Sequence, residues 1–205
     1  MDVLIGLCLG ITLSAACGLR IFIPPLILSI AALIGDLQLL PSLQWLGTYP
    51  ALMVLATATV IEILAYYVPG ISNLLDLIEI PTAIAIGTVL TAASLGDLNP
   101  VLQWSLALLA GGGSAGIVES ATAATRFAAN TLTVGTATPV VSTAEAGLSV
   151  LLTLLGLALP LFAATAVILI MIGLIRKAIN MLRRARHKRR EAAQRKSLSK
   201  VRVFT

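Results

Sequence analysis

Residues 142–175 read STAEAGLSVLLTLLGLALPLFAATAVILIMIGLI, a run of 34 residues in which Glu145 is the one charged side chain. As a single helix it would be about 51 Å long, which exceeds the roughly 30 Å hydrocarbon core of a bilayer. We therefore expect either one tilted helix kinked at Pro160 or two shorter segments. Both arrangements place the run in a membrane.

The rest of the 205-residue chain shares this apolar character, with 58% hydrophobic residues, 11% charged residues and a mean hydropathy of +1.00. An ordinary soluble domain is about 45–50% apolar and about 25% charged. Too few polar side chains are present to cover a surface that faces water, whereas lipid accepts an apolar exterior. The composition predicts an all-α, polytopic integral membrane protein.

Breaks between the apolar runs predict about six transmembrane helices, several of them short or broken. The expected helices cover residues 3–17, 21–34, 49–68, 81–95, 101–124 and 142–175. The first two runs are short against the roughly 20 residues that span a bilayer, so the turn at Arg20 between them is expected inside the protein.

Two segments are expected to depart from transmembrane helix. Residues 71–80 read as a re-entrant or interfacial segment, and residues 126–139 as a loop or a broken segment. Glu62 precedes Pro81 by 19 residues and Glu119 precedes Pro139 by 20, which raises the hypothesis of an internal repeat. Repeats with broken helices are common in transporters.

The charges divide the chain into a transmembrane domain, residues 1–175, and a basic tail, residues 176–205. The first part carries eight acidic and two basic residues, and the tail carries twelve basic residues and one acidic residue. Basic segments beside a membrane helix stay in the cytoplasm, so we expect a cytoplasmic C-terminus in a bacterial inner membrane or a comparable membrane.

The expected partners of the basic tail are the lipid bilayer and its anionic headgroups, at about 1 kcal/mol for each Lys or Arg near the surface. The basic run lacks interleaved aromatic residues and follows a membrane helix directly. Nucleic acid is therefore not expected as a partner.

Three glutamates within the apolar runs are the strongest candidates for function, because a carboxylate in lipid is costly and normally faces a bundle interior or water. Each shares a helix face with polar or small residues. The three faces are Thr59, Glu62 and Tyr66; Gly112, Gly116, Glu119, Thr122 and Arg126; and Ser142, Glu145, Ser149, Thr153 and Gly156. If these faces converge, they line a polar interior able to bind a cation or relay a proton.

Arg20 and Arg126 are the expected counter-charges of these glutamates. A structural alternative stays open, in which Glu119 pairs with Arg126 or Arg20 and nothing is transported. Glu145 lies near its helix start, where the helix dipole stabilises an acid by about 0.3–1 kcal/mol.

Asp76 and Glu79 lie in the segment 71–80. These two acids either form a site where ions bind as they enter the protein or belong to a solvated loop.

Enzymatic activity and cofactors are not expected. The one histidine, His187, lies in the basic tail, so no Ser/His/Asp or Cys/His arrangement can form. Cys8 and Cys17 face opposite directions on one helix and have no metal-ligand spacing. The glycines at 111, 113 and 116 match G-x-G-x-x-G without a surrounding βαβ unit, so they indicate close helix packing rather than a nucleotide site.

Several short patterns together resemble an uncharacterised family of membrane proteins, the domain of unknown function 4126. They include Cys17-Gly18-Leu19-Arg20 followed by Phe22 and Pro24, Tyr67-Val68-Pro69-Gly70 after Glu62, Asp76, the glycine run with Arg126, and Pro139-Val140-Val141-Ser142 before Glu145. The resemblance covers about residues 1–175. It implies a polytopic membrane domain and brings no established activity.

These observations favour a small transporter or channel-like protein for a cation, a proton or a small solute. A homodimer is plausible because the membrane domain is small. The competing hypothesis is a non-catalytic structural or assembly protein of a membrane complex. Such a protein would dock partners through the Gly112/Gly116 face and the basic tail.

Overall fold

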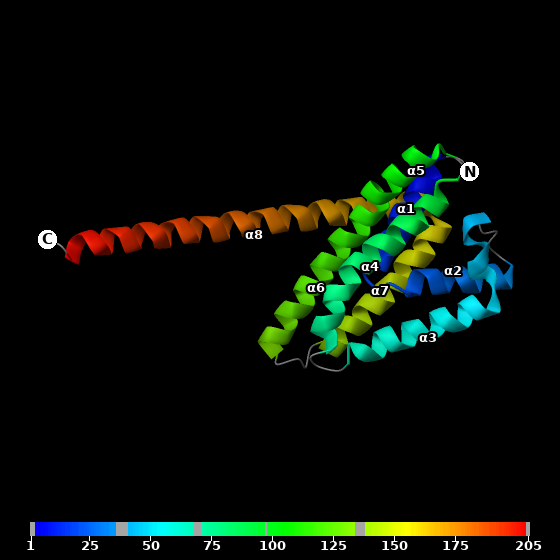
Figure 1. Cartoon of the computed structure of the whole chain (residues 1–205), viewed down its shortest axis with the longest axis horizontal. Coiled ribbons are helices and arrows are strands. Elements are labelled where there is room, and N and C mark those ends of the chain that lie inside the picture. Colours follow the sequence, from blue (N-terminus) through cyan, green and yellow to red (C-terminus); the bar gives the residue numbers. More distant parts are fainter. Residues whose placement is uncertain (1–2, 36–40, 68–70, 97, 134–137, 204–205) are drawn as a thin grey trace. The chain divides into compact units, whose positions relative to one another are not determined.

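The computed structural model describes the backbone of residues 3–35, 41–67, 71–96, 98–133 and 138–203, and within these ranges nearly all of it is helical (Figure 1). Side chains are described for the same residues apart from 41–42, 71–74, 76, 130, 132, 138, 182 and 184–203. The elements are α1 (Val3–Cys17), α2 (Ile23–Ile34), a 3-10 helix η1 (Pro41–Gly47), α3 (Tyr49–Ala65), α4 (Ile71–Ser94), α5 (Pro100–Leu106), a π-helix η2 (Ala107–Gly112), α6 (Gly113–Thr133), α7 (Thr138–Ala158) and α8 (Pro160–Val203).

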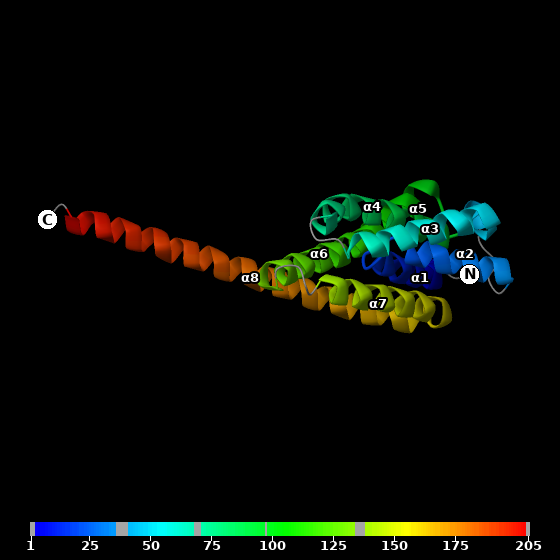
Figure 2. The same cartoon turned by 90° about the horizontal axis from the view of Figure 1, so that it is seen from below.

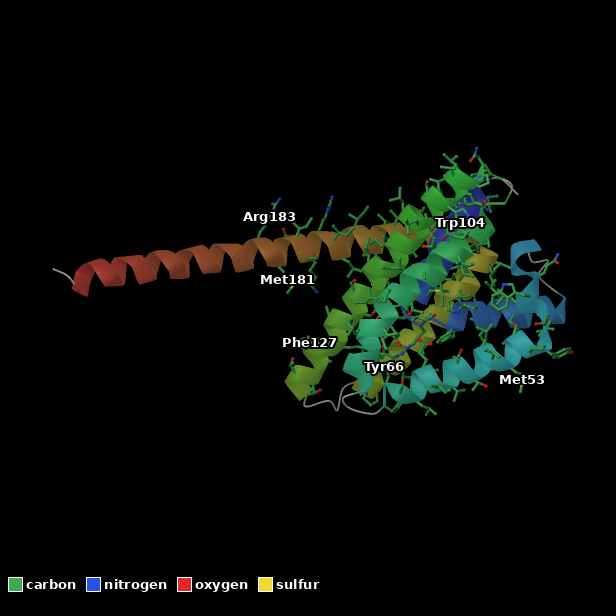
Figure 3. The ribbon with its side chains drawn as sticks, in the orientation of Figure 1. Met53, Tyr66, Trp104, Phe127, Met181 and Arg183 are labelled. Carbon is green, nitrogen blue, oxygen red and sulfur yellow. The ribbon has the colours of Figure 1, made fainter. Side chains whose placement is uncertain are left out.

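Four helical stretches of the described residues are long and apolar enough to cross a membrane: Leu77–Ser94, Pro100–Ala129, Pro139–Ala158 and Pro160–Met181. α1, α2 and α3 are apolar but shorter. Large apolar side chains such as Met53 and Phe127 are exposed, while Tyr66 is buried (Figure 3). An apolar exterior around a polar interior is the arrangement that lipid favours. The predicted all-α membrane fold is confirmed.

The chain forms two compact units, Met1–Ile168 and Leu169–Thr205. The first unit contains α1 to α7 and the beginning of α8. The second unit is the remainder of α8, which is helical to Val203. The predicted tail, residues 176–205, belongs to this second unit, and its side chains beyond Arg183 lie outside the described residues.

Helix α1 lies at the centre of the first unit and packs against α4, α6 and α7 (Figure 2). Small residues allow this close approach. A Cβ atom added at Gly10 would lie 2.7 Å from Thr91 Cγ2 of α4, and one added at Gly156 of α7 would lie 2.8 Å from Thr12 Cγ2. The short α1 is therefore enclosed by protein on several sides.

The turn between α1 and α2 is buried, as the short apolar runs predict. Arg20 in this turn is 1% exposed. Pro24 and Pro25 follow in the first turn of α2. Proline is tolerated there because the N–H groups of the first turn have no acceptor within the helix. The chain thus changes direction inside the protein, and the turn brings an arginine into the interior.

The predicted break between residues 71–80 and 81–95 is wrong, because α4 continues through Pro81. A proline inside a helix removes one backbone hydrogen bond, which membrane helices tolerate where nearby side chains satisfy the freed groups. The carbonyl that this proline leaves without its helical donor is that of Leu77, four residues earlier, and the helix continues past it. Residues 71–80 are therefore the first part of a longer helix.

The segment 126–139, predicted as a loop or a broken segment, is not a loop over its first part, since α6 extends to Thr133; α7 begins at Thr138, so one helix does end and another begin within it. Threonine hydroxyls in this extension bond to carbonyls of the preceding turn, which satisfies the hydroxyl groups but does not itself stabilise a helix. Thr133 Oγ1 donates to Ala129 O at 2.7 Å. The polar composition that suggested a loop is accommodated within the helix.

Residues 142–175 divide into two helices, which decides between the two arrangements expected for this run. α7 ends at Ala158 and α8 begins at Pro160. The proline stands at a helix start, where its fixed φ angle is suitable, instead of kinking one long helix.

The glycine run packs against α4 within the same chain. A Cβ atom added at Gly112 would lie 2.6 Å from Thr88 Oγ1, and one at Gly116 would lie 3.0 Å from Ile84 Cγ1. Close helix packing is therefore confirmed. The idea that a separate partner docks on the Gly112/Gly116 face is wrong, because α4 already occupies that face.

Candidate functional site

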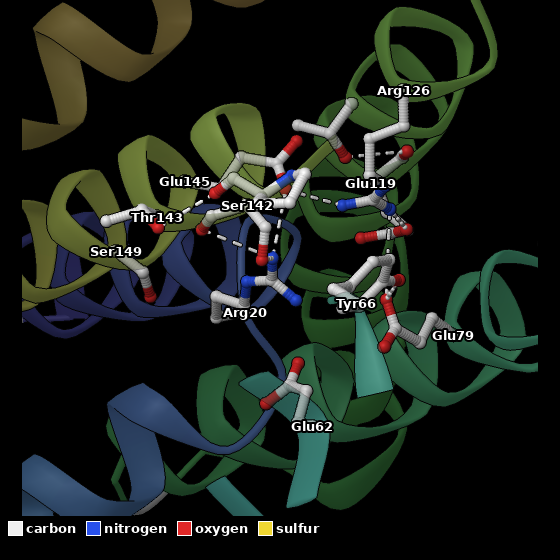
Figure 4. Close-up of polar contacts among 12 residues, drawn as sticks. Arg20, Glu62, Tyr66, Glu79, Glu119, Arg126, Ser142, Thr143, Glu145 and Ser149 are labelled. Atoms are coloured by element: carbon white, nitrogen blue, oxygen red, sulfur yellow. Dashed lines mark hydrogen bonds and ion pairs between the residues drawn. The ribbon is translucent and has the colours of Figure 1, made fainter. Parts of the chain in front are cut away.

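The three glutamate-bearing faces meet inside the first unit in a cluster of charged and polar side chains that we call the polar centre (Figure 4). Every member is buried, with at most 6% of its surface exposed. The members are Arg20 from the α1–α2 turn, Glu62 and Tyr66 from α3 and its C-terminal end, Glu79 from α4, Glu119 and Arg126 from α6, and Ser142 and Glu145 from α7.

Arg126 is surrounded by carboxylates from three helices. Its Nη2 lies 2.6 Å from Glu119 Oε1, and its Nη1 lies 2.6 Å from Glu145 Oε2. Glu79 Oε2 lies 3.8 Å from Nη2. The short charge-assisted bond to Glu145 joins α6 to α7, and the longer ion pair to Glu79 adds α4 at the same point.

Tyr66 connects the two arginines. The guanidinium carbon of Arg20 lies 4.1 Å from the centre of the Tyr66 ring, and that of Arg126 lies 4.7 Å from it. The Tyr66 hydroxyl donates a hydrogen bond to Glu79 Oε2. One aromatic side chain therefore supports both cations by cation–π contact and also binds an acid.

Arg20 uses one of its three nitrogens for the hydrogen bonds that the described contacts include. Nη2 donates to Ser142 Oγ at 2.5 Å, to Ser142 O at 3.2 Å and to Glu145 Oε2 at 3.3 Å. The buried Nε and Nη1 atoms have no hydrogen-bond partner in the described structure. Unsatisfied buried donors are uncommon in native proteins, so this side of the guanidinium is unusual.

Glu62 binds the backbone at the start of α2. Its Oε1 accepts a hydrogen bond from Ile21 N at 2.8 Å, and its Oε2 accepts one from Phe22 N at 3.3 Å. Both N–H groups belong to the buried turn immediately before α2, where the dipole at the start of the helix favours negative charge. Glu62 therefore ties α3 to the buried turn without a close ion pair to either arginine among the described contacts.

The described members of the polar centre include four carboxyl groups and two guanidinium groups. If all were ionised, two negative charges would have no arginine to balance them. A buried charge that no opposite charge balances costs several kcal/mol per ion, even after the protein relaxes. The cluster is therefore suited to taking up positive charge.

Five of the six candidate residues named from sequence come together here: Arg20, Glu62, Glu119, Arg126 and Glu145. The side chain of the sixth, Asp76, lies outside the described residues, and its backbone belongs to α4. The structural alternative, in which Glu119 pairs with Arg126, is also present as a contact at 2.6 Å.

Sequence reasoning placed Tyr66 and Ser142 on the glutamate faces without a specific role, and it did not place Glu79 in the polar interior. Glu79 was separated from the membrane helices because a break was expected at Pro81. Read as one helix, α4 places Glu79 on the same buried face as Ala83 and Leu90, at spacings of 4 and 11 residues. This helical spacing is the sequence feature that would have placed Glu79 in the site.

Hydroxyl groups that extend the glutamate faces bond to the backbone. Ser149 Oγ donates to Ala16 O at 2.9 Å, and Thr59 Oγ1 donates to Leu55 O at 2.8 Å. The polar contacts that involve charged groups are thus concentrated near the arginines. The described residues contain no group of three or more His, Cys, Asp or Glu side chains arranged to hold a metal ion.

Comparison with curated proteins and with solved structures finds no match. A family model does match, under the description "Domain of unknown function (DUF4126)", and the match covers residues 7–179. It contains every member of the polar centre. The chain therefore belongs to the DUF4126 family of proteins, as the short sequence patterns indicated.

Proposed function

We propose that this protein is a small transporter or channel-like protein that passes a cation or a proton through the polar centre. The observation that supports it is the excess of four buried carboxyl groups over two buried guanidinium groups among the described side chains. Intramembrane acids normally mark ion or proton pathways, because positive charge that binds to them offsets the cost of burying them. No catalytic role is proposed.

The interrupted path of α1 and α2 also supports transport. Irregular backbone at membrane depth is tolerated where protein or water surrounds it, and broken helices often border transport sites. Here the interruption at residues 18–22 brings Arg20 into the polar centre and directs two N–H groups at Glu62.

The test is Glu62→Gln in protein reconstituted into lipid vesicles. Glutamine has the size of glutamate but cannot carry the negative charge. We expect cation or proton flux to fall roughly tenfold or more, while helix content and elution volume stay unchanged. Glu191→Gln, the same change in the basic tail, is the control and should leave flux as in the parent. A Glu62→Gln variant that conducts like the parent would refute the proposal.

A structural or assembly role is the second candidate, and the close pairing of Arg126 with Glu119 and Glu145 favours it. In that case the acids stabilise the bundle and no ion passes. The parent protein would then be inert in vesicles, and a membrane partner would co-purify through the basic tail. Deletion of residues 184–205 would abolish such co-purification without unfolding the bundle.

We further propose that the C-terminus is cytoplasmic and that the basic tail rests on anionic headgroups. Twelve basic residues within the last 30 support this, because such segments resist transfer across a membrane. A reporter that works only in the cytoplasm should be active when it is fused to the C-terminus. Activity of a reporter that requires the opposite side would refute the assignment.

A further inference from the structure

The side of Arg20 that faces Glu62 lacks an acceptor for its N–H groups. The residue is 1% exposed, and Nη2 makes all of its described hydrogen bonds. Nε and Nη1 are buried without a partner. A buried charged donor that is left unsatisfied loses its hydration without replacement, so an acceptor at this position would stabilise the protein.

Glu62 lies opposite this unsatisfied side. Figure 4 shows the Arg20 guanidinium and the Glu62 carboxylate pointing toward one another. The described contacts include no ion pair between them. A small molecule between the two groups would need to accept a hydrogen bond from Arg20 and to exchange one with Glu62.

We propose that this position is a water site and that it makes Glu62 a proton-binding group, so that the species carried is the proton. This inference rests on the proposed function and specifies its substrate. Water suits the position because a buried water molecule typically makes two to four hydrogen bonds to polar groups. It can accept from Arg20 Nη1 whether Glu62 is ionised or protonated.

The described groups around Glu62 do not form a metal site, although they also stabilise its ionised form. Its two carboxylate oxygens meet the N–H groups of Ile21 and Phe22, and the guanidinium of Arg20 faces it. All three are donors. Hard metal cations require several oxygen ligands. A proton needs only one carboxylate oxygen.

The proton-transfer step involves no other reactant. A proton from the aqueous phase on one side of the membrane binds to the water between Arg20 and Glu62. The protonated water passes a proton to Glu62 Oε2, where a new O–H bond forms as one water O–H bond breaks, and neutral water remains. Release reverses the transfer toward the other side, so charge and atoms balance over a cycle.

Flux measurements distinguish this inference from the proposed function. Vesicles containing a pH-sensitive dye are given either a pH gradient or a gradient of Na⁺ or K⁺. We expect the parent to dissipate the pH gradient at the same rate when Na⁺ and K⁺ are replaced by a bulky organic cation. Flux of Na⁺ or K⁺ without proton movement would overturn the proton assignment and leave the proposed function standing. Absence of every flux would overturn both.

Infrared spectroscopy tests the site without relying on transport. On acidification we expect a carboxylic acid band that is absent from Glu62→Gln and present in Glu191→Gln. In D2O the band should shift within the mixing time, because water reaches the group. A band that Glu62→Gln leaves intact, or one that does not shift, would overturn the water site.

Discussion

The Arg126 side and the Arg20 side of the polar centre contain the same kinds of side chain but differ in pairing. Arg126 has three carboxylate oxygens within 3.8 Å, two of them at 2.6 Å. Arg20 has one, Glu145 Oε2, at 3.3 Å, and two of its nitrogens have no described partner. Glu62, which faces Arg20, is held by backbone N–H groups instead.

The difference indicates a division of roles within one cluster. Closely paired charges resist rearrangement, because separating them would leave uncompensated charge in a medium of low dielectric constant. A less completely paired arginine and carboxylate can change partners or protonation at lower cost. We therefore infer that the Arg126 side stabilises the bundle and that the Arg20 side exchanges protons.

The largest expected effect is that of Arg126→Met. It would leave Glu119, Glu145 and Glu79 without their shared cation, and breaking a buried pair in this way costs about 3–5 kcal/mol. We expect a large fall in the midpoint of thermal unfolding in detergent micelles, measured by circular dichroism. Arg183→Met, a change at an exposed position in the second unit, is the matched control and should have little effect.

Arg20→Met provides the comparison between the two sides. Glu145 would keep its 2.6 Å contact with Arg126, so this variant should lose clearly less stability than Arg126→Met. Equal losses for the two variants would mean that both arginines serve the bundle alike.

Tyr66→Phe should destabilise the protein less than Arg126→Met and more than Ser142→Ala. It removes the hydroxyl that donates to Glu79 and retains the ring that contacts both arginines. A hydrogen bond to a charged group contributes about 1.5–3 kcal/mol, so we expect the unfolding midpoint to fall by less than in Arg126→Met. Tyr66→Leu, which also removes the ring, should lose more. If Tyr66→Phe and Tyr66→Leu were equivalent, the cation–π contacts would contribute nothing measurable.

The candidate residues could be predicted from sequence because the cost of a charge in lipid does not depend on the fold. Glu62, Glu119 and Arg126 stand out within apolar helices whatever surrounds them. The bounds of α1 could also be predicted, because the apolar run at residues 3–17 coincides with the helix.

The pairings could not be predicted, because they join residues that are far apart in the chain. Arg20 and Glu145 are separated by 125 positions, and no local period relates them. The sequence predicted breaks before Pro81 and at residues 126–133, where the helices in fact continue. In both places the helix continues through residues whose local preference is to end it, because packing in the bundle outweighs that preference, which composition alone does not reveal. The hypothesis of an internal repeat stays a prediction.

The smallest expected effect on stability distinguishes the two sides most directly. Ser142→Ala removes one of three described hydrogen bonds from Arg20 Nη2 and leaves those to Ser142 O and Glu145 Oε2, so we expect a loss below the roughly 1.5–3 kcal/mol of a complete hydrogen bond to a charged group. Ser149→Ala removes a similar bond in the same helix, to Ala16 O, and touches neither arginine among the described contacts. Both losses are small, so Ser142→Ala should unfold only slightly below Ser149→Ala. Only Ser142→Ala should alter the rate of proton flux, because it alone changes how Arg20 is held opposite Glu62. Equal flux in the two variants would contradict a working role for the Arg20 side, even if both proteins were stable.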